Sequence, residues 1–547
     1  MQQPGFVLKL TAMETSSGVE GSVVMREWPW LIVASTLVCA LSLVYFWWQH
    51  PLYGRNRGPK LLPIVGCLPQ IAMNANRLYD WSTEQMQGTP TQTWRGILPG
   101  NFDWIETANA ANVEHILKTN FENYPKGEFL PAIFFDLLGF GIFAADGNVW
   151  KLQRRVASPL FATRTLRDLA LSSVQTELTE RLVPVLDSFS DSNKVVDLQE
   201  LLLRFTFDSI CQLAFGSDPC CLTPGLPSVP FAEAFDEAVN LITGRAMGTS
   251  LHWPVLKFFN IGSERKIRQS LSIIDSFAFD LIRARRKELA DGHRNQVSDL
   301  LSRFIPIADE FVESPDIKQK IEEDPRSKFV QASDLFLRDI VISFILAGRD
   351  TSACALTWFF WLLSSNPKVE ANICKEVETI LSSQPGEKQE STFSFDELKD
   401  MHYLHAALTE SMRLYPPVPM DSKQAAGDDV LPDGTVISKG ILTVFNMYAM
   451  GRNETIWGSD CLEFRPDRFL RDGIFVPPSP FAYPIFQAGP RICLGMDMGM
   501  MQMKLIAATL IRRYVFVVRE GHCAHYGWSL TMKIVKGLPV YVRRREV

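Results

Sequence analysis

The feature that most constrains this chain is one long helical pattern. It reads SDLFLRDIVISFILAGRDTSACALTWFFWLL and runs from Ser333 to Leu363. Apolar residues occupy almost every side of this helix, so no face of it suits water. At ~1.5 Å per residue, such a helix is long enough to cross a whole domain. The chain is therefore expected to fold around a single long helix that is buried along most of its length.

Two further patterns set the balance of secondary structure. The stretch FDELKDMHYLHAALTESMRLY has helical spacing and ends at Pro416-Pro417, which breaks a helix. Near the C-terminus, LTMKIVKGLPVYVRRR alternates apolar and polar residues around a turn at Lys536-Gly537, which indicates strands. The sequence therefore predicts a mainly α protein with small β-sheets.

An uncharged apolar stretch lies near the N-terminus. From Trp30 to Trp48 no residue is charged, and aromatic residues mark both ends, as in a membrane-spanning helix. A cleaved signal peptide is disfavoured because the stretch is long and ends in bulky aromatics. A buried core helix is the remaining alternative. The basic residues after the stretch place the bulk of the chain in the cytosol by the positive-inside rule. The predicted organisation is a lumenal tail at 1–27, a transmembrane anchor at 28–50, a Pro-rich hinge at 51–70 and a globular domain at 71–547.

Charge and cysteine content exclude other classes of protein. The formal net charge is −6, whereas nucleic-acid binding needs a basic face to neutralise phosphates. The ten cysteines are scattered without any C-x-x-C pair. This distribution differs from the disulfide framework of a small secreted protein, so the thiols are expected to be reduced and mostly buried.

One cysteine stands out by its neighbours. Around Cys493 the spacing is F-x-x-G-x-R-x-C-x-G. Glycines before the cysteine permit a tight turn, and the helix expected after it directs free N–H groups at the sulfur. Both features are expected to favour the thiolate, the form that binds metals. A buried inert thiol is the ordinary alternative for a lone cysteine.

Five methionines follow this cysteine, and soft sulfur ligands also suit copper(I). At about 100° per residue of a helix, Met496, Met500 and Met503 fall on one face, and Met498 and Met501 on the opposite one. Thioethers divided in this way do not converge on one ion. The first three are therefore predicted to pack in the core, where flexible thioethers fill irregular gaps.

The long helix carries an acid and an alcohol among its apolar residues, Asp350 and Thr351. Burying Asp350 is unfavourable unless it is paired or has a chemical role. The hydroxyl of Thr351 is expected to bond the carbonyl of Ala347, four residues back, which opens a small groove in the helix. A single capped polar turn is the alternative interpretation.

Together with E-x-x-R, F-R-P-D-R-F and W-x-x-x-R, these motifs resemble the cytochromes P450, the haem-thiolate monooxygenases. The resemblance implies the cytochrome P450 fold, a helix-rich catalytic domain with small β-sheets. It also implies haem b (iron protoporphyrin IX) as the cofactor, with Cys493 as the axial ligand of the iron. Phe486, Arg491, Trp150 and Arg154 are then the expected haem-binding residues.

The same resemblance assigns further roles and covers about residues 58 to 547. Asp350 and Thr351 correspond to the acid and the alcohol that deliver protons during cleavage of O₂. A structural triad behind the haem is implied for three residues, which are Glu410, Arg413 and Arg468.

Electrons are expected from a partner protein. The stretch GFGIFA imitates a dinucleotide fingerprint, but a lone match without a βαβ context is weak. The resemblance instead implies NADPH acting through a separate NADPH-cytochrome P450 reductase at the endoplasmic reticulum membrane. A basic face that includes Lys151 and Arg155 is expected to receive that reductase.

The substrate is inferred from resemblance alone. The stretches RLYPPVPMDSKQAAGDDVLPDGTVISKG and FTFDSICQLAFGSDP resemble the plant fatty-acid ω-hydroxylase group. Hydroxylation of a medium- to long-chain fatty acid at or near the ω carbon is therefore expected. The alternatives are another lipophile (a sterol, a terpenoid or a fatty-acid conjugate) and a non-catalytic haem-binding membrane protein. The expected pocket residues are Phe344, Ala347, Val418, Pro419 and Met420.

Overall fold

The structure is a computed structural model. It describes residues 32–44, 58–59, 61–62, 65–98, 102–246, 252–291, 299–313, 318, 321, 324–328, 330–382 and 393–545. The longer helices are α3 (Leu78–Gln87), α5 (Phe129–Leu138), α6 (Gly147–Ala162), α7 (Arg164–Glu177), α8 (Val183–Ser192), α9 (Leu198–Phe215), α10 (Pro230–Arg245), α11 (His252–Phe259), α12 (Ser263–Ala290), α13 (Leu300–Val312), α15 (Ala332–Ser364), α16 (Pro367–Ser382), α18 (His402–Leu414) and α21 (Met496–Arg513). The shorter helices are α2 (Leu68–Met73), α4 (Ala110–Glu114), α17 (Phe395–Asp400), α19 (Met447–Gly451) and α20 (Glu454–Trp457).

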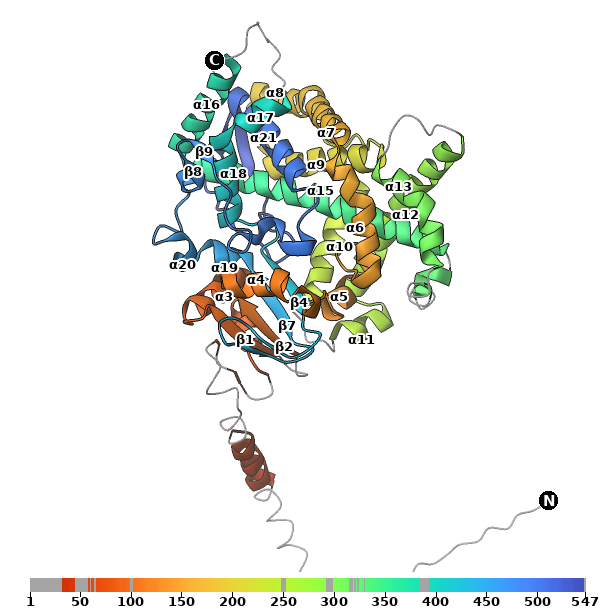
Figure 1. The fold of residues 1–547 in the computed structure, drawn as a ribbon, viewed down its shortest axis with the longest axis vertical. Helices are drawn as coiled ribbons and strands as arrows, with labels where there is room; N and C mark the ends of the chain where they lie inside the picture. The colour runs from red at the N-terminus through yellow and green to blue at the C-terminus, as the bar shows by residue number, and fades with distance from the viewer. Residues whose placement is uncertain are drawn as a thin grey trace, which may run out of the picture.

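The helix α15 forms the axis of the molecule, as the sequence predicted. It crosses the middle of the structure with other helices on both sides (Figure 1). Its neighbour α9 approaches closely because Gly348 has no side chain, and a Cβ there would lie 2.5 Å from Ile210. The hydroxyl of Thr206 on α9 also donates to the carbonyl of Arg349 at 2.8 Å. Each large apolar side chain that α15 buries contributes about 1.5–3 kcal/mol, so this helix organises the core.

The strands form two larger sheets and two short pairs. The first sheet has the order β1 (Thr93–Leu98), β2 (Phe102–Thr107), β7 (Leu442–Asn446) and β4 (Met420–Gln424), with β2 and β7 parallel. The second has the order β10 (Tyr514–Val518), β11 (Pro539–Arg544) and β3 (Val195–Asp197). The short pairs are β5 (Asp429–Val430) with β6 (Val436–Ile437) and β8 (Leu470–Arg471) with β9 (Ile474–Phe475).

The C-terminal alternation does not make a hairpin around Lys536-Gly537. The turn is present, and Gly537 has a φ of +66°. The segment before the turn, however, contributes only an isolated bridge between Ile534 and Tyr526. The strand after the turn, β11, pairs instead with β10 and β3. Sequence alternation marked the strand correctly but did not reveal its partners, which lie outside the alternating segment.

The second helical pattern is two helices, α17 and α18, rather than one. Ser394 and Glu397 form a capping box that starts α17. The backbone at Met401 leaves the helical region, with φ −74° and ψ 79°. The carboxylate of Glu376 on α16 then accepts the free N–H groups of Tyr403 and Leu404, at 2.6 and 2.8 Å. A side chain from another helix therefore caps the N-terminus of α18.

The predicted membrane anchor is only partly described. The described helix Ile32–Val44 is apolar and exposed along its length. At ~1.5 Å per residue it is shorter than the ~30 Å hydrocarbon core of a bilayer. The rest of the predicted anchor at 28–50, the tail at 1–27 and most of the hinge at 51–70 lie outside the described residues. Among the described helices, only α15 has the length and composition of a membrane span, and 83% of its most apolar window is buried inside the protein.

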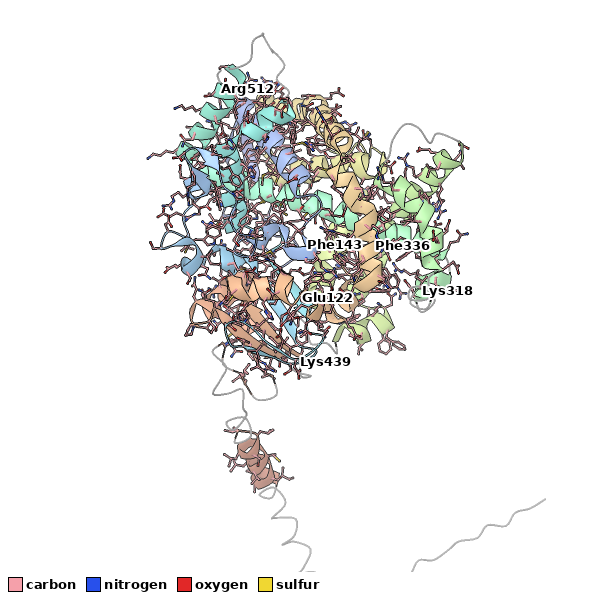
Figure 2. The ribbon with its side chains drawn as sticks, in the orientation of Figure 1. Glu122, Phe143, Lys318, Phe336, Lys439 and Arg512 are labelled. Atoms are coloured by element: carbon pink, nitrogen blue, oxygen red, sulfur yellow. The ribbon has the colours of Figure 1, made fainter. Side chains whose placement is uncertain are left out.

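The globular part has exposed charged side chains and a buried apolar core. Lys318 and Lys439 lie at its periphery, whereas Phe336 on α15 is buried (Figure 2). A cavity lies between α15, α6 and the first sheet.

Candidate active site

The cysteine loop is held by backbone contacts. Cys493 follows a 3₁₀ turn, Gly489–Arg491, and precedes α21. Its N–H donates to the carbonyl of Phe486 at 2.8 Å. Gly489 has a φ of +65°, and a Cβ there would lie 2.1 Å from the carbonyl oxygen of Leu117. Only glycine fits this left-handed and crowded position, which explains the F-x-x-G-x-R-x-C spacing.

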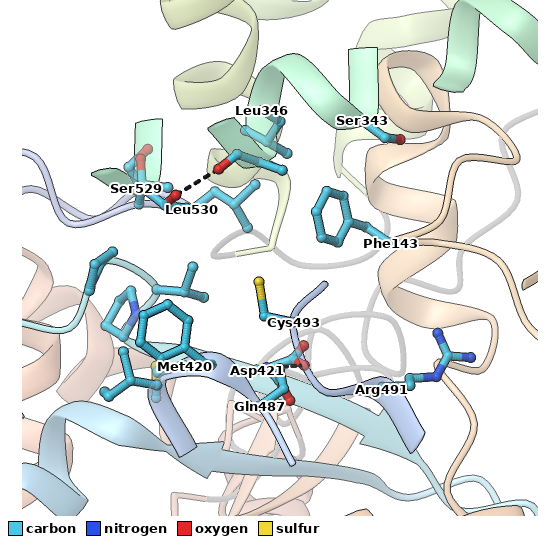
Figure 3. Close-up of a pocket in the computed structure, with 18 of the residues that line it drawn as sticks. Phe143, Ser343, Leu346, Met420, Asp421, Gln487, Arg491, Cys493, Ser529 and Leu530 are labelled. Atoms are coloured by element: carbon cyan, nitrogen blue, oxygen red, sulfur yellow. Dashed lines mark hydrogen bonds between the residues drawn. The ribbon is translucent and has the colours of Figure 1, made fainter. Parts of the chain in front are cut away.

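The sulfur of Cys493 points into an enclosed space, with α15 on the opposite side (Figure 3). The residue is exposed to this cavity, although the protein surrounds it. Burial raises the pKa of the Cys493 thiol, while the N–H of Gly495 and the cation of Arg154 oppose that rise. The N–H at the start of the helix therefore favours the thiolate, as predicted, but burial has the larger effect on this pKa. A metal ion deprotonates a thiol that coordinates it.

The cavity has a volume of about 560 Å³. It brings together most of the residues that the sequence singled out. The predicted site residues that line it are Trp150, Arg154, Phe344, Ala347, Thr351, Val418, Pro419, Met420, Phe486, Arg491 and Cys493. Asp350 and the predicted triad do not line it.

Asp350 and Thr351 lie at different depths. The hydroxyl of Thr351 donates to the carbonyl of Ala347 at 2.6 Å, as predicted. The carboxylate of Asp350 is fully buried. It is paired with Arg349, at 2.7 Å, and with Lys533, at 3.1 Å. Its burial is therefore compensated by two cations, and it lies behind the cavity wall.

One side of the cavity is suited to hold an anion. The guanidinium of Arg491 lies 4.4 Å from the ring centre of Trp150 and pairs with Asp146. Its Nε atom is buried and has no hydrogen-bond partner in the described part of the chain. Burial lowers the pKa of Arg491, although Asp146 and Asp421 oppose this. Arg154 lines the same space and donates to the carbonyl of Ile492.

Lys423 on β4 is a cavity-lining residue that sequence reasoning missed. Its side chain is 1% exposed, and its Nζ atom has no partner among the described residues. Burial, reinforced by the nearby Lys126, holds the pKa of Lys423 well below its usual range. A lysine is seldom buried without a partner. No pattern in the sequence marks it, because its burial follows from the packing of β4 in the sheet.

Beside Lys423, a polar cluster joins β4 to the cysteine loop. Lys126 and Asp421 form an ion pair at 2.6 Å. The amide of Gln487 donates to Asp421 at 3.0 Å, while its own oxygen has no partner in the described residues. Gln487 also has a φ of +62°, which is uncommon for a residue with a side chain. The loop therefore keeps a strained backbone next to Cys493.

These features fit a haem group. A thiol in the cavity matches an axial ligand of haem iron. The unpartnered nitrogens of Lys423 and Arg491 match the two anionic propionates of that cofactor. Trp150 and Arg154 add further donors on the same side. The residues present are therefore able to hold haem.

The predicted triad is assembled in the core. The carboxylate of Glu410 receives Arg413 at 2.6 Å and Arg468 at 3.0 Å, and all three side chains are buried. Arg413 also donates to the carbonyls of Gly451 and Cys461. These bonds fix the segment between β7 and the cysteine loop to α18, so the contacts are structural rather than directed at the cavity.

The methionines of α21 pack on more sides than predicted. Met500 and Met503 are buried, as expected, but Met496 is only partly buried, and Met501 is buried as well. Met498 is partly buried between two core clusters. The opposite side of the helix is also covered, because α21 packs against α7, α15, α16 and α18.

Two further sequence features lie at α5 and α6. GFGIFA follows the helix α5 rather than a strand, which excludes a dinucleotide-binding fingerprint at this position. Lys151 and Arg155 lie exposed on α6, the helix that carries Trp150 and Arg154.

The chain was compared with known proteins. The cytochrome P450 family model matches residues 57–532. Cytochrome P450 94A1 of Vicia sativa is 41% identical over 500 residues, which cover 89% of this chain and 91% of that protein. Cytochrome P450 86B1 of Arabidopsis thaliana is 42% identical over 543 residues, covering 97% and 94%. Cytochrome P450 94C1 of Arabidopsis thaliana is 43% identical over 475 residues, covering 86% and 90%. The chain therefore belongs to the cytochrome P450 family of haem-thiolate monooxygenases.

Proposed function

We propose that the protein hydroxylates a medium- to long-chain fatty acid at or near its terminal methyl group. The observation that carries the proposal is the distribution of charge in the cavity. The cationic side chains that line the described cavity are Lys126, Arg154, Lys423 and Arg491. These four belong to the haem-binding side, beside the cysteine loop.

Apolar side chains make up another part of the lining. Leu346 on α15 and Leu530 from the C-terminal segment lie on the α15 side of the Cys493 sulfur (Figure 3). Phe344 on α15 and Val418 before β4 also line the cavity. An apolar lining favours the apolar end of an amphiphilic substrate. A fatty acid is therefore expected to enter with its methyl end toward the reacting position and its carboxylate far from it.

The protein's share of the chemistry follows from these residues. When bound, haem supplies activation of O₂ at its iron, and a cysteine thiolate ligand favours cleavage of the O–O bond. In this proposal Cys493 binds the iron, and Lys423 and Arg491 bind the propionates. Phe344 and Ala347 orient the substrate chain.

Protons are proposed to reach the cavity through the α15 pair. Thr351 lines the cavity, while the carboxylate of Asp350 lies behind the wall. General acid–base groups placed in this way contribute about 10²–10⁴-fold to a rate. Both roles rest on the positions of the two side chains and on the family resemblance.

The family generally takes its electrons from a redox partner. We propose NADPH-cytochrome P450 reductase as that partner, docking on the α6 face that exposes Lys151 and Arg155. We also propose attachment to the endoplasmic reticulum membrane through an N-terminal anchor. The exposed apolar helix Ile32–Val44 supports this attachment. The exposed Phe258 and Phe259 of α11 are a second apolar feature of the surface.

The test is turnover in microsomes that contain the protein, a reductase and NADPH. A panel of medium- and long-chain fatty acids is offered together with a sterol and a terpenoid, and products are identified by mass spectrometry. Terminal or near-terminal hydroxy acids are expected. Oxidation of the sterol or the terpenoid alone would overturn the substrate class but not the reaction. The Cys493→Ala variant should lose the absorption band of the reduced, carbon-monoxide-bound thiolate haem.

A further inference from the structure

The carboxylate of Asp350 needs a link to the cavity if it is to deliver protons there. It is fully buried and does not line the cavity. Its neighbour Thr351 does line the cavity, but the hydroxyl of Thr351 donates to Ala347 on its own helix. The hydroxyl of Thr351 is therefore directed at its own helix rather than at the carboxylate of Asp350.

A residue far away in the chain supplies such a contact. The hydroxyl of Thr531 donates to Oδ2 of Asp350 at 3.4 Å, which is long for a hydrogen bond. Thr531 is buried from the outside and lines the cavity. It also lies against the thiol of Cys354 on α15. Of the cavity-lining side chains in the described ranges, it is the one that bonds Asp350.

The groups behind Asp350 keep this carboxylate in place. Lys533, two residues after Thr531, lies 3.1 Å from Asp350 and 2.7 Å from Asp236 on α10. Asp236 also pairs with Arg349 at 2.7 Å. Although burial opposes it, the carboxylates of Asp350 and Asp236 raise the pKa of Lys533. Lys533 therefore stays charged and holds Asp350, rather than passing on its own proton.

The network also reaches the outside of the protein. The side chain of Asp236 is 32% exposed, that of Lys533 is 18% exposed and that of Asp350 is fully buried. Exposure thus falls step by step from the surface to Asp350, and Thr531 opens on the cavity at the other end. Solvent has access to one side of this network, and the cavity adjoins the other side.

We propose that Thr531 is a positioning residue that connects Asp350 to the cavity during proton delivery. Asp350 starts as a carboxylate, and its Oδ2 takes up a proton that enters from solvent. The Thr531 hydroxyl then turns so that its oxygen accepts this proton, while its original hydroxyl proton passes to a water molecule in the cavity, and Asp350 is a carboxylate again. The net change is the movement of one proton from solvent into the cavity. This inference rests on the proposed role of Asp350 in the monooxygenase reaction.

The test compares Thr531→Val, which keeps the shape but removes the hydroxyl, with Thr531→Ser, which keeps the hydroxyl. In the holoenzyme with reductase and NADPH, Thr531→Val should lower the product formed per NADPH by about tenfold, with matching release of peroxide. The solvent isotope effect on the turnover of Thr531→Val should be larger than that of the wild type. Thr531→Ser should restore coupling, and the peroxide-supported rate should stay near that of the wild type. Thr509→Val, which removes a buried hydroxyl outside the cavity, is the matched control.

A spectroscopic measurement separates the hydrogen bond from turnover. The infrared band of the Asp350 carboxyl group is identified by its loss in Asp350→Asn. This band should shift in Thr531→Val but not in Thr531→Ser. The inference is overturned by an unshifted band, by wild-type coupling in Thr531→Val, or by equal uncoupling in the valine and serine variants. If Asp350→Asn itself remains fully coupled, the proposed role of Asp350 fails together with this inference. If only Asp350→Asn is uncoupled, the role of Asp350 stands and the link through Thr531 fails.

Discussion

Replacing Lys423 by methionine should have opposite effects on the haem-free and the haem-bound protein. Without haem, the Nζ atom of Lys423 is buried and unpartnered, and burial lowers its pKa well below the usual range. An unsatisfied buried polar group costs about 1–3 kcal/mol. Lys423→Met removes that cost, because methionine has a similar length and no polar nitrogen. The haem-free variant should therefore be more stable than the haem-free wild type.

The sign of the pH dependence follows from the same pKa. Because the pKa of Lys423 is lower in the folded state, the unfolded state binds more protons between that pKa and the ordinary value of ~10.4. The stability of the haem-free wild type should therefore rise with pH across this window. The contribution of Lys423 to this rise should be absent in Lys423→Met. Urea unfolding at several pH values measures both effects.

With haem bound, the lysine is expected to be charged and paired with a propionate. Removing one partner of a buried ion pair costs about 3–5 kcal/mol. Since each 1.4 kcal/mol is about tenfold, haem binding should weaken by about two to four orders of magnitude. Transfer of haem to an excess of a haem-scavenging globin measures this loss. Lys439→Met, at an exposed surface position, is the control. If Lys423→Met releases haem as slowly as the wild type, the assignment of Lys423 to a propionate is wrong.

Three further changes test other parts of the structure. Glu410→Gln leaves the buried Arg413 without its charge partner and leaves Arg468 paired with Asp460 alone, so unfolding should become easier by about 3–5 kcal/mol. Denaturant unfolding measures this, with the exposed Glu454→Gln as control, and an unchanged midpoint would contradict the structural role. Charge reversal at Lys151 and Arg155 should slow NADPH-supported turnover and spare peroxide-supported turnover, and equal losses in both assays would argue against reductase docking there. Burial raises the pKa of Glu106 to about 7, so the folded state binds the extra proton and stability should fall by ~3 kcal/mol as pH rises from 4.5 to 7. Glu106→Gln should flatten that slope in a pH series of thermal melts, and a slope identical to that of the wild type would exclude Glu106 as its cause.

Local patterns predicted the parts of the site that lie within one short segment. The cysteine loop needs Gly489 for a crowded backbone and Cys493 four residues later, so its spacing is visible in the sequence. The hydrogen bond from Thr351 to Ala347 is also local, since the two residues lie one helical turn apart. The expected pocket residues also line the cavity, but they were inferred from the family resemblance rather than from a local pattern.

The charge environment of the site was not predictable in this way. The surroundings of Cys493 raise its pKa because the sulfur is enclosed by protein, and enclosure depends on elements from the whole chain. Lys423 lies in a strand whose sequence does not indicate burial. Met501 is buried because several helices pack around α21, whereas a helical projection considers one helix at a time.

The sequence by itself determined the long buried helix α15, the haem-binding cysteine motif and the mainly α class, because hydrophobic periodicity and tight-turn chemistry act over a few residues. The tertiary structure alone decided which groups meet. Glu376 starts α18, and Thr531 and Lys533 meet Asp350 across 181 and 183 positions of the chain. Such contacts depend on how distant segments pack, and side-chain electrostatics at the site is set by those distant partners.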